Sequence, residues 1–269
     1  MLNFNKNHNE NRGAHCLPDF FFTRSVKVFF LLLLLLTGCK SRIAKTEHIV
    51  QVPYSVDELE HRTFNFFWEL ADPVTYQIPD RYPTLTFSSI AATGFGLSAY
   101  SIGVERKYVT REQAATRTLR TLQALWQLRQ GPDKADISGY HGFFYHFLTL
   151  DKSSRYHEVE LSSIDTGLLM AGILSSMSYF DQHNRVEDSI RLTSDNLYRR
   201  VEWSWMMNDS LQLSMGWSPE HGFIPNQWKG YNEAMILLIM GIGSPTHPLP
   251  AEVWTQWCST YTWNKYEGQ

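Results

Sequence analysis

Apolar residues recur at helical spacing along most of the chain beyond residue 53. The helices at about 162–180 and 231–240 are apolar nearly all round, which predicts burial, whereas those at about 110–129 and 186–208 are amphipathic. Ser55 with Glu58, and Thr110 with Gln113, have the spacing of capping boxes at two helix starts. With the stop signals, the pattern predicts seven helices, at about 55–71, 88–102, 110–129, 162–180, 186–208, 231–240 and 251–259.

Two short stretches between the helices have strand character. The first has apolar runs at 142–148 and 155–161 on either side of a polar turn at 151–154. The second has runs at 211–217 and 223–225. Each stretch predicts a small β-hairpin inserted between helices.

Amphipathic helices that alternate with buried ones are typical of an all-α fold, the (α/α)6 toroid, in which helical hairpins form an outer and an inner ring. An irregular helical bundle is the alternative that the pattern leaves open. A closed toroid of six hairpins has twelve helices, and seven are predicted. Since no helix stop signal follows Trp263, we expect a ring that is incomplete in this chain, with its C-terminal part missing.

The N-terminal segment has the pattern of a secretory signal. Arg24 and Lys27 precede an apolar run at 28–36, which is too short to span a bilayer. The run ends in Leu36-Thr37-Gly38-Cys39, which resembles the lipobox of bacterial lipoproteins; an ordinary signal peptide is the alternative. We therefore expect a signal peptide at 1–38, lipidation of Cys39, a polar tether at 39–52 and a folded domain at 53–269.

Composition narrows the functional classes. The chain has 24 Lys and Arg against 27 Asp and Glu, a net charge of −3, which excludes a basic nucleic-acid binder. Aromatic residues make up 14% of the sequence, a level typical of packed helices or of sugar-binding surfaces. With Cys16 removed and Cys39 acylated, Cys258 has no disulfide partner.

Common catalytic motifs are missing from the sequence. The nucleophile elbow GxSxG, the phosphate loop GxxxxGK[ST] and the zinc motif HExxH do not occur. His141, His146 and His157 lack the spacing of metal ligands, so we expect no metal site.

Two acids stand at the starts of the two most apolar helices. Asp165 lies in the first turn of the helix at 162–180, and Glu233 stands near the start of the helix at 231–240. If both helices are in the inner ring, the two carboxylates face one cleft, as an acid and base pair for glycoside hydrolysis requires. The alternative is that each carboxylate caps its helix. Glu160 is a third candidate, with a hydrogen-bonding or ion-pair role.

Aromatic residues near Glu233 could form a surface on which a sugar ring packs. Trp217, Trp228 and Tyr231 are the candidates, and core packing is the alternative for each ring. Asp80 and Arg81 lie in a proline-rich loop, where they form either a substrate-binding loop or a buried ion pair.

Six segments in order resemble the glucoamylase-like domain family, which includes the bacterial endo-β-1,2-glucanases of glycoside hydrolase family 144. The resemblance covers about residues 55–257. Its motifs are FSSIAATGFGL (87–97), IGVER (102–106), GFFYHF (142–147), LSSIDT (161–166), GW (216–217) and GYNEAM (230–235).

The resemblance implies an (α/α)6 toroid, no cofactor, and hydrolysis of β-1,2-linked glucan with inversion. It implies that Glu233 is an essential acid and Asp165 the second, with Tyr231, Trp217, Asp80 and Arg81 on the sugar-binding side. Family members continue through further helices and a further acidic region, so the division of roles stays open.

We therefore predict a lipid-anchored glycoside hydrolase in the bacterial cell envelope, periplasmic or on the outer-membrane surface. Its expected partners are an oligo- or polysaccharide and, through the anchor, the membrane; we expect a monomer that binds no nucleic acid. A non-catalytic glycan-binding lipoprotein or inactive remnant is the alternative, and a transglycosylase is a third hypothesis.

Overall fold

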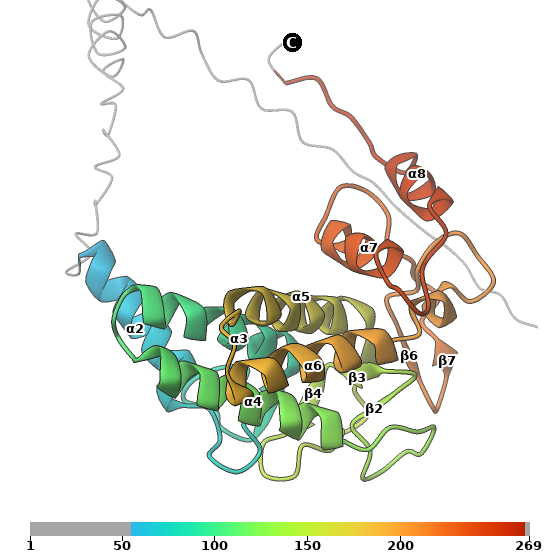
Figure 1. Cartoon of the computed structure of the whole chain (residues 1–269). Helices are drawn as coiled ribbons and strands as arrows, with labels where there is room; N and C mark the ends of the chain where they lie inside the picture. Colours follow the sequence, from blue (N-terminus) through green and yellow to red (C-terminus); the bar gives the residue numbers. More distant parts are fainter. Residues whose placement is uncertain (1–54, 267–269) are drawn as a thin grey trace, which may run out of the picture. The chain divides into compact units, whose positions relative to one another are not determined.

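The computed structural model describes residues 55–266, which lie within one compact unit, Pro53–Gln269. The prediction of a mainly helical fold with small β inserts is confirmed (Figure 1). A 3₁₀ helix at Trp203–Met207 follows α6. The α-helices of the described residues are α2 (Val56–Glu69), α3 (Ile90–Glu105), α4 (Arg111–Gln127), α5 (Ser163–Tyr179), α6 (Arg185–Arg200), α7 (Ala234–Ile242) and α8 (Glu252–Cys258).

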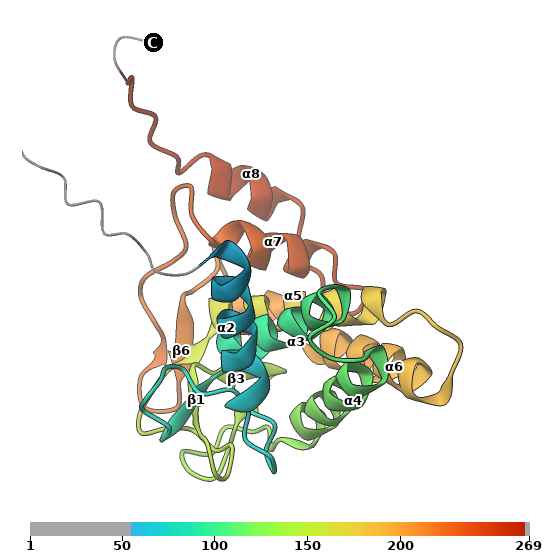
Figure 2. The same ribbon diagram turned by 90° about the vertical axis from the view of Figure 1, so that its left-hand side faces the viewer.

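The helices form two layers. In the inner layer α5 packs between α3 and α7, while α4 and α6 pack against each other, with α4 on α3 and α6 on α5 (Figures 1 and 2). The helices α3 and α5 have buried residues on most of their circumference, as their apolar sequences predict. This alternation of inner and outer helices along the chain is the arrangement expected of an α/α toroid.

Two glycines bring the backbones of α3 and α5 together. A Cβ on Gly172 would lie 2.1 Å from the carbonyl oxygen of Gly94, and one on Gly94 would lie 2.7 Å from the Cα of Leu169. Only glycine permits this approach, so at this point the backbones of the two inner helices are in direct contact.

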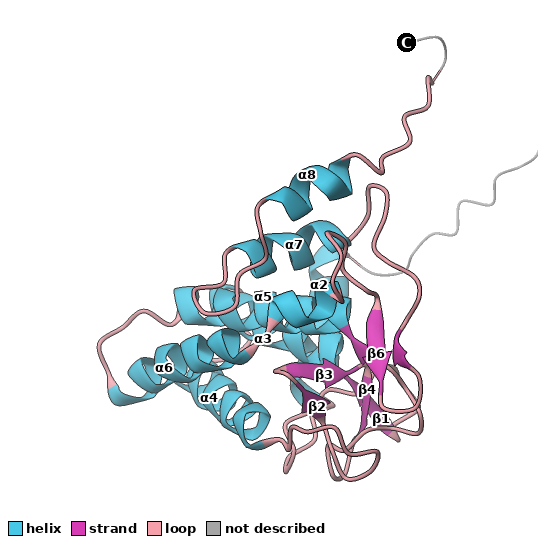
Figure 3. Ribbon diagram, turned by 90° about the vertical axis from the view of Figure 1, so that its right-hand side faces the viewer, coloured by secondary structure: helices cyan, strands magenta, loops and turns pink. Residues whose placement is uncertain are grey.

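Short strands gather beside one end of the helices (Figure 3). Strand β1 (Phe87–Ser89) pairs with β4 (Phe147–Thr149). The second sheet is antiparallel throughout, in the order β2-β3-β5-β6-β7. Its strands are β2 (Gly139–Tyr140), β3 (Phe143–Tyr145), β5 (Leu161–Ser162), β6 (Gly216–Ser218) and β7 (Gly222–Phe223).

Two inner helices begin in the same way, each directly after a strand. Strand β1 leads into α3, and β5 leads into α5. The Ser89 hydroxyl accepts a hydrogen bond from the amide of Ala92 at 3.3 Å, and the Ser162 hydroxyl accepts one from the amide of Asp165 at 3.2 Å. Serine therefore caps both helices, and the third helical residue is alanine in one and aspartate in the other.

The next residue of each helix continues the repeat. The Thr93 hydroxyl donates to the carbonyl of Ser89 at 3.1 Å and accepts from the amide of Ile78. The Thr166 hydroxyl donates to the carbonyl of Ser162 at 2.8 Å and accepts from the amide of Phe144. One strand-to-helix junction is thus built twice from the same hydrogen bonds.

The structure corrects two predicted details. The helix expected at 186–208 ends at Arg200, because the amide of Glu202 donates to the carbonyl of His141 at 3.0 Å instead of continuing the helix. The capping box expected at Ser55 is half formed: its hydroxyl accepts from the amide of Glu58, whose carboxylate pairs with Arg62.

An apolar groove of about 470 Å³ runs between α2 and α3. Four large side chains along it are about half exposed or more: Val56 and Leu59 from α2, and Phe95 and Ile102 from α3. None of the helices in the described part of the chain is long and apolar enough to cross a membrane. The predicted signal peptide, tether and lipidated Cys39 lie outside the described residues.

Candidate active site

Two of the predicted acids meet at a histidine where the second sheet joins α5. The Nδ1 atom of His146 lies 2.8 Å from Oε1 of Glu160, and its Nε2 atom lies 3.6 Å from Oδ1 of Asp165. His146 follows β3, Glu160 precedes β5, and Asp165 lies in the first turn of α5. The antiparallel register of β3 and β5 places His146 opposite Glu160, and the amide of His146 also donates to the Glu160 carbonyl.

The three groups shift one another's pKa. Burial alone lowers the pKa of His146, but the hydrogen bond with Glu160 and the charges of Asp165, Glu160 and Asp80 outweigh it, so the net pKa is raised. Burial alone raises the pKa of Glu160, but the hydrogen bond with His146 outweighs it, and the net pKa is lowered. At neutral pH Glu160 is therefore an anion that favours a protonated His146.

Asp165 has the opposite shift. Burial raises the pKa of Asp165, and the charge of His146 and the hydrogen bond from Ser162 only partly offset that effect. The Ser162 hydroxyl donates to Oδ2 of Asp165. A carboxyl group that keeps its proton to higher pH than an exposed aspartate has the property that a general acid requires.

The helix start does not require the Asp165 carboxylate. Ser162 caps α5, and at the matching junction of α3 the same serine cap works with Ala92 in the position of Asp165. Ser162, and not Asp165, is therefore the N-cap of α5, and the Asp165 carboxylate lies in the first turn of the helix.

Glu233 stands immediately before α7 with its side chain exposed. Its carboxylate makes no capping hydrogen bond, since the Asn232 side chain accepts from the amide of Ala234 at 3.0 Å instead.

The first turns of α5 and α7 lie side by side. A Cβ on Gly167, two residues after Asp165, would lie 3.4 Å from the Cα of Leu237, four residues after Glu233. In addition, Nε1 of Trp228, from the segment before α7, donates to the hydroxyl of Ser163 at 2.9 Å. The two candidate carboxylates thus stand at the same end of adjacent inner helices.

The Asp80 and Arg81 loop lies near this end. Oδ2 of Asp80 accepts from Nε of Arg81 at 2.6 Å, and the Arg81 guanidinium lies 5.5 Å from the centre of the Phe87 ring. The Asp80 carboxylate contributes to the field at His146. The Arg81 side chain is 62% exposed, so the pair is an ion pair at the surface and not a buried one.

The aromatic candidates fall into separate groups. Trp217 pairs with Leu161 across β6 and β5, and its ring lies 5.7 Å from that of Trp205 and 5.3 Å from that of Tyr140. Tyr231 is 73% exposed, and its ring meets the edge of Tyr261. The sequence suggested that these rings crowd around Glu233; of them, Trp217 belongs instead to a cluster around Trp205.

An ion pair holds the sheet beside the acids. The Arg155 guanidinium, whose side chain is 2% exposed, makes two hydrogen bonds of 3.0 and 2.9 Å to the Glu220 carboxylate. It also donates to the carbonyl of Val159 and lies over the Tyr145 ring. Arg155 therefore ties the loop before Glu160 to the β6–β7 turn.

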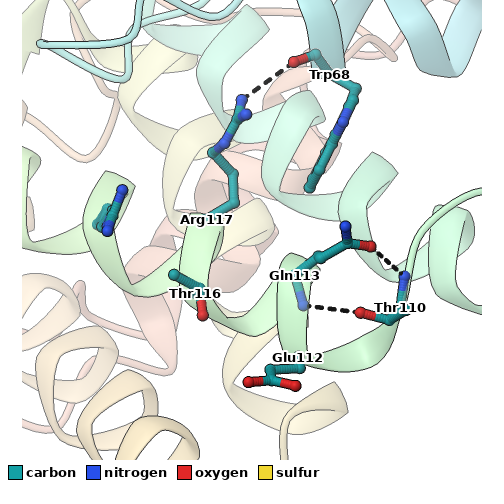
Figure 4. Close-up of a pocket in the computed structure, with 7 residues that line it drawn as sticks. Trp68, Thr110, Glu112, Gln113, Thr116 and Arg117 are labelled. Carbon is teal, nitrogen blue, oxygen red and sulfur yellow. Dashed lines mark hydrogen bonds between the residues drawn. The ribbon is translucent and has the colours of Figure 1, made fainter.

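A larger hollow, of about 570 Å³, lies elsewhere, at the start of α4 (Figure 4). The guanidinium carbon of Arg117 lies 4.5 Å from the centre of the Trp68 ring, and the guanidinium donates to the Trp68 carbonyl. Thr110 and Gln113 form the predicted capping box. The only carboxylate among the residues that line this hollow is Glu112. It therefore lacks the acid pair that hydrolysis needs.

Among residues 55–266, no group of three or more His, Cys, Asp or Glu side chains is arranged to hold a metal ion.

Sequence reasoning considered His146 only as a metal ligand and so missed its role. The predicted hairpin did not reveal the contact, because pairing 142–148 with 155–161 end to end places residue 146 opposite residue 157, whereas the observed register pairs Tyr145 with Leu161 and so brings residue 146 opposite residue 160.

Comparison with known proteins finds relatives among glucoamylase-like proteins and β-1,2-glucan hydrolases. A family described as "Putative glucoamylase" matches residues 225–269. The chain is 31% identical over 217 residues to the exo β-1,2-glucooligosaccharide sophorohydrolase (non-reducing end) of Parabacteroides distasonis, a match that covers 76% of this chain and 28% of that protein.

Two solved structures show the same fold. The endo-β-1,2-glucanase of Chitinophaga pinensis, in complex with sophorotriose and glucose, superimposes with a TM-score of 0.67 at 28% identity, covering 76% of this chain and 50% of that one. A "putative glucoamylase" of Bacteroides uniformis superimposes with a TM-score of 0.68 at 28% identity, covering 80% and 54%. The resemblance to glucoamylase-like proteins and β-1,2-glucanases is confirmed, and the chain spans between 28% and 54% of the length of these relatives.

Proposed function

We propose that the protein is a glycoside hydrolase that cleaves β-glucan, with β-1,2-glucan as substrate. The observation that carries the proposal is the buried Asp165 carboxyl, which lies 3.6 Å from His146, follows a helix start already capped by Ser162, and has a pKa raised by burial. The names of the relatives support the substrate class, since the curated relative acts on β-1,2-glucooligosaccharides and one solved relative is a β-1,2-glucanase.

In this proposal Asp165 is the general acid. It donates its proton to the glycosidic oxygen as the bond to the anomeric carbon breaks, so that the leaving sugar departs as a neutral alcohol. Hydrogen bonds from Ser162 and the charge of His146 then stabilise the carboxylate that remains.

Glu233 is the second carboxylate. Its exposed side chain, free of hydrogen bonds from the described residues, suits a base that takes a proton from a water molecule. Attack by that water on the face opposite the leaving group gives inversion, for which the two carboxyl groups stand roughly 6.5–9.5 Å apart. Trp217, Trp228, Tyr231, Asp80, Arg81 and Glu160 are proposed to contact the sugar or to position these groups.

The test is release of reducing sugar from linear β-1,2-glucan by the purified protein, with the product lengths read by chromatography. We expect short oligosaccharides, and roughly 10²- to 10⁴-fold lower kcat in Asp165→Asn, the loss that follows removal of a general acid. Glu233→Gln should lose turnover while it keeps its affinity for the glucan.

A matched control is the substitution of an acid that lies outside the site. Glu112→Gln changes a carboxylate at the start of α4, in the hollow of Figure 4, and should leave turnover unchanged. Glucan binding without turnover in the unaltered protein would favour the glycan-binding alternative. Longer or cyclic products would indicate a transglycosylase.

We further propose that the protein is anchored in the bacterial cell envelope through a lipid on Cys39. The support is the sequence Leu36-Thr37-Gly38-Cys39 after a cationic and apolar segment. Labelling of the expressed protein with a fatty-acid probe tests this: the label should be incorporated and should disappear in Cys39→Ser.

A further inference from the structure

Charged groups from three segments of the chain act on His146. Glu160 approaches it from the start of β5, Asp165 from α5 and Asp80 from the loop before β1, while its ring stacks on Phe147 at 3.8 Å between centroids. Two cations lie beyond this circle: Arg81 pairs with Asp80, and Arg155 acts on Glu160. Two carboxyl groups therefore contact the imidazole, and Asp80 adds the field of a third negative charge.

We propose that His146 is a positioning residue of the active site: Glu160 holds its ring in the charged form, and the charged ring stabilises the Asp165 carboxylate left when the proton has gone to the substrate. The proposal rests on the proposed role of Asp165 as general acid. His146 lacks the sequence spacing of a metal ligand, and this proposal gives it a different role in the active site.

The geometry supports this order of action. The contact of 2.8 Å between Glu160 and Nδ1 is a hydrogen bond, so it fixes the orientation of the ring and the proton on that nitrogen. The distance of 3.6 Å from Nε2 to Asp165 is too long for a good hydrogen bond but short enough for strong attraction between opposite charges. The attraction is weak while Asp165 is neutral and grows as Asp165 becomes an anion.

Burial gives this attraction its effect. The Asp165 side chain is 11% exposed, so water screens its charge little, and a buried anion needs a compensating partner. Ser162 supplies one hydrogen bond to Oδ2, and His146 faces the other oxygen, Oδ1. Each oxygen of the Asp165 carboxylate that remains after proton transfer thus has its own stabilising group.

The first test needs no catalytic activity. In the full-length protein labelled with ¹⁵N-histidine, the His146 ring is followed by NMR as the pH is varied. We expect its pKa to lie above the ordinary value, and to fall in both Asp165→Asn and Glu160→Gln, because each substitution removes a negative charge. His141, which pairs with Glu202 at 2.8 Å, gives an internal reference in the same spectra. A His146 titration that is the same in the unaltered protein and in Asp165→Asn would overturn the proposal.

The second test is kinetic and compares His146→Gln with His141→Gln. We expect His146→Gln to lower kcat roughly 10- to 100-fold with little change in KM, since the lost interaction acts on charge that develops during the reaction. Without the neighbouring cation Asp165 keeps its proton longer, so the alkaline limb of the rate profile should move to higher pH. His141→Gln should show neither effect. An alkaline limb that stays in place in His146→Gln would sink the proposal.

The two tests separate this inference from the proposed function. If the protein hydrolyses no glucan, the proposed function fails, and the NMR comparison still decides whether His146 and Asp165 are coupled. If glucan is hydrolysed but Asp165→Asn leaves the His146 titration unmoved, the positioning role fails alone.

Discussion

Gly94 and Gly172 meet where α3 packs on α5, and a Cβ on Gly172 would lie only 2.1 Å from the carbonyl oxygen of Gly94. The second helix therefore touches the first through its main chain. Since Asp165 lies in the first turn of α5 and α3 carries the matching junction, this contact sets how the strand-to-helix ends of the two inner helices stand relative to each other.

Substitution of Gly172 by alanine should destabilise the protein. The added methyl group meets backbone atoms of α3, which have no side-chain freedom with which to yield, so we expect a loss of about 3 kcal/mol or more in the free energy of unfolding by urea. Gly131→Ala is the control, because its Cβ would find its nearest neighbours at 3.5 Å. Equal stability of the two variants would contradict the close approach.

Removal of either serine cap should lower the stability of the protein, but only one of the two substitutions should change the pH dependence of catalysis. Ser89→Ala and Ser162→Ala each remove one cap from an inner helix and should each cost about 1 kcal/mol in thermal or urea unfolding. Only Ser162 also donates to Asp165, a hydrogen bond that lowers the Asp165 pKa against the effect of burial. The alkaline limb of the rate profile should therefore move to higher pH in Ser162→Ala and stay in place in Ser89→Ala.

Asp165→Asn should be at least as stable as the unaltered protein at neutral pH. Burial raises the Asp165 pKa in the folded state, so the folded state binds more protons than the unfolded one and stability falls as the pH rises from the ordinary aspartate range through the raised pKa. Asparagine cannot ionise and does not suffer this loss. Urea unfolding at a series of pH values should show that the free energy of unfolding of the variant rises relative to that of the unaltered protein over that interval. A large loss of stability at pH 7 would indicate a structural role for the carboxylate.

The Arg155 and Glu220 pair should make the protein more stable as the pH rises, which is the opposite of the effect expected for Asp165. The hydrogen bonds from Arg155 lower the Glu220 pKa, so this contribution is complete above the ordinary glutamate pKa and is lost as the pH falls through the lowered value. Glu220→Gln leaves a buried guanidinium without its anion and should cost roughly 3 kcal/mol at pH 7. The difference from the unaltered protein should shrink in acid.

A surface pair provides the comparison for that measurement. Arg199 and Asp195 are 45% and 42% exposed and lie one turn apart on α6. Asp195→Asn should cost less than about 1 kcal/mol, because water and salt screen such a pair. A similar loss in both variants would mean that burial of Arg155 has no energetic consequence.

Much of the helical layout was readable from the sequence because it depends on local signals. Helical spacing and caps predicted α2 and α4 closely, with Ser55 and Thr110 at their N-caps as expected. The circumferential burial of α5 followed from its apolar composition. These features depend on neighbours within one or two turns, where sequence carries the information.

Long-range pairing was not readable in the same way. Strand β1 pairs with β4 through residues such as Ser88 and Leu148, sixty positions apart. The end of α6 is set by the hydrogen bond from Glu202 to the carbonyl of His141, which belongs to another element. The same limit hid the meeting of His146 with Asp165 and with Glu160, because the register of β3 with β5 differs by three residues from the one that the predicted hairpin gives.

The repeated junction at the starts of α3 and α5 has an evolutionary consequence. Because serine and threonine build the helix start in both places, the third helical position is open to change, and it holds Ala92 in one copy and Asp165 in the other. Alanine and aspartate codons differ by a single base. A lineage can therefore gain or abandon the acid at such a position in one mutational step while the scaffold stays folded, which lets chemistry be redistributed around a ring of helices without redesign of the ring.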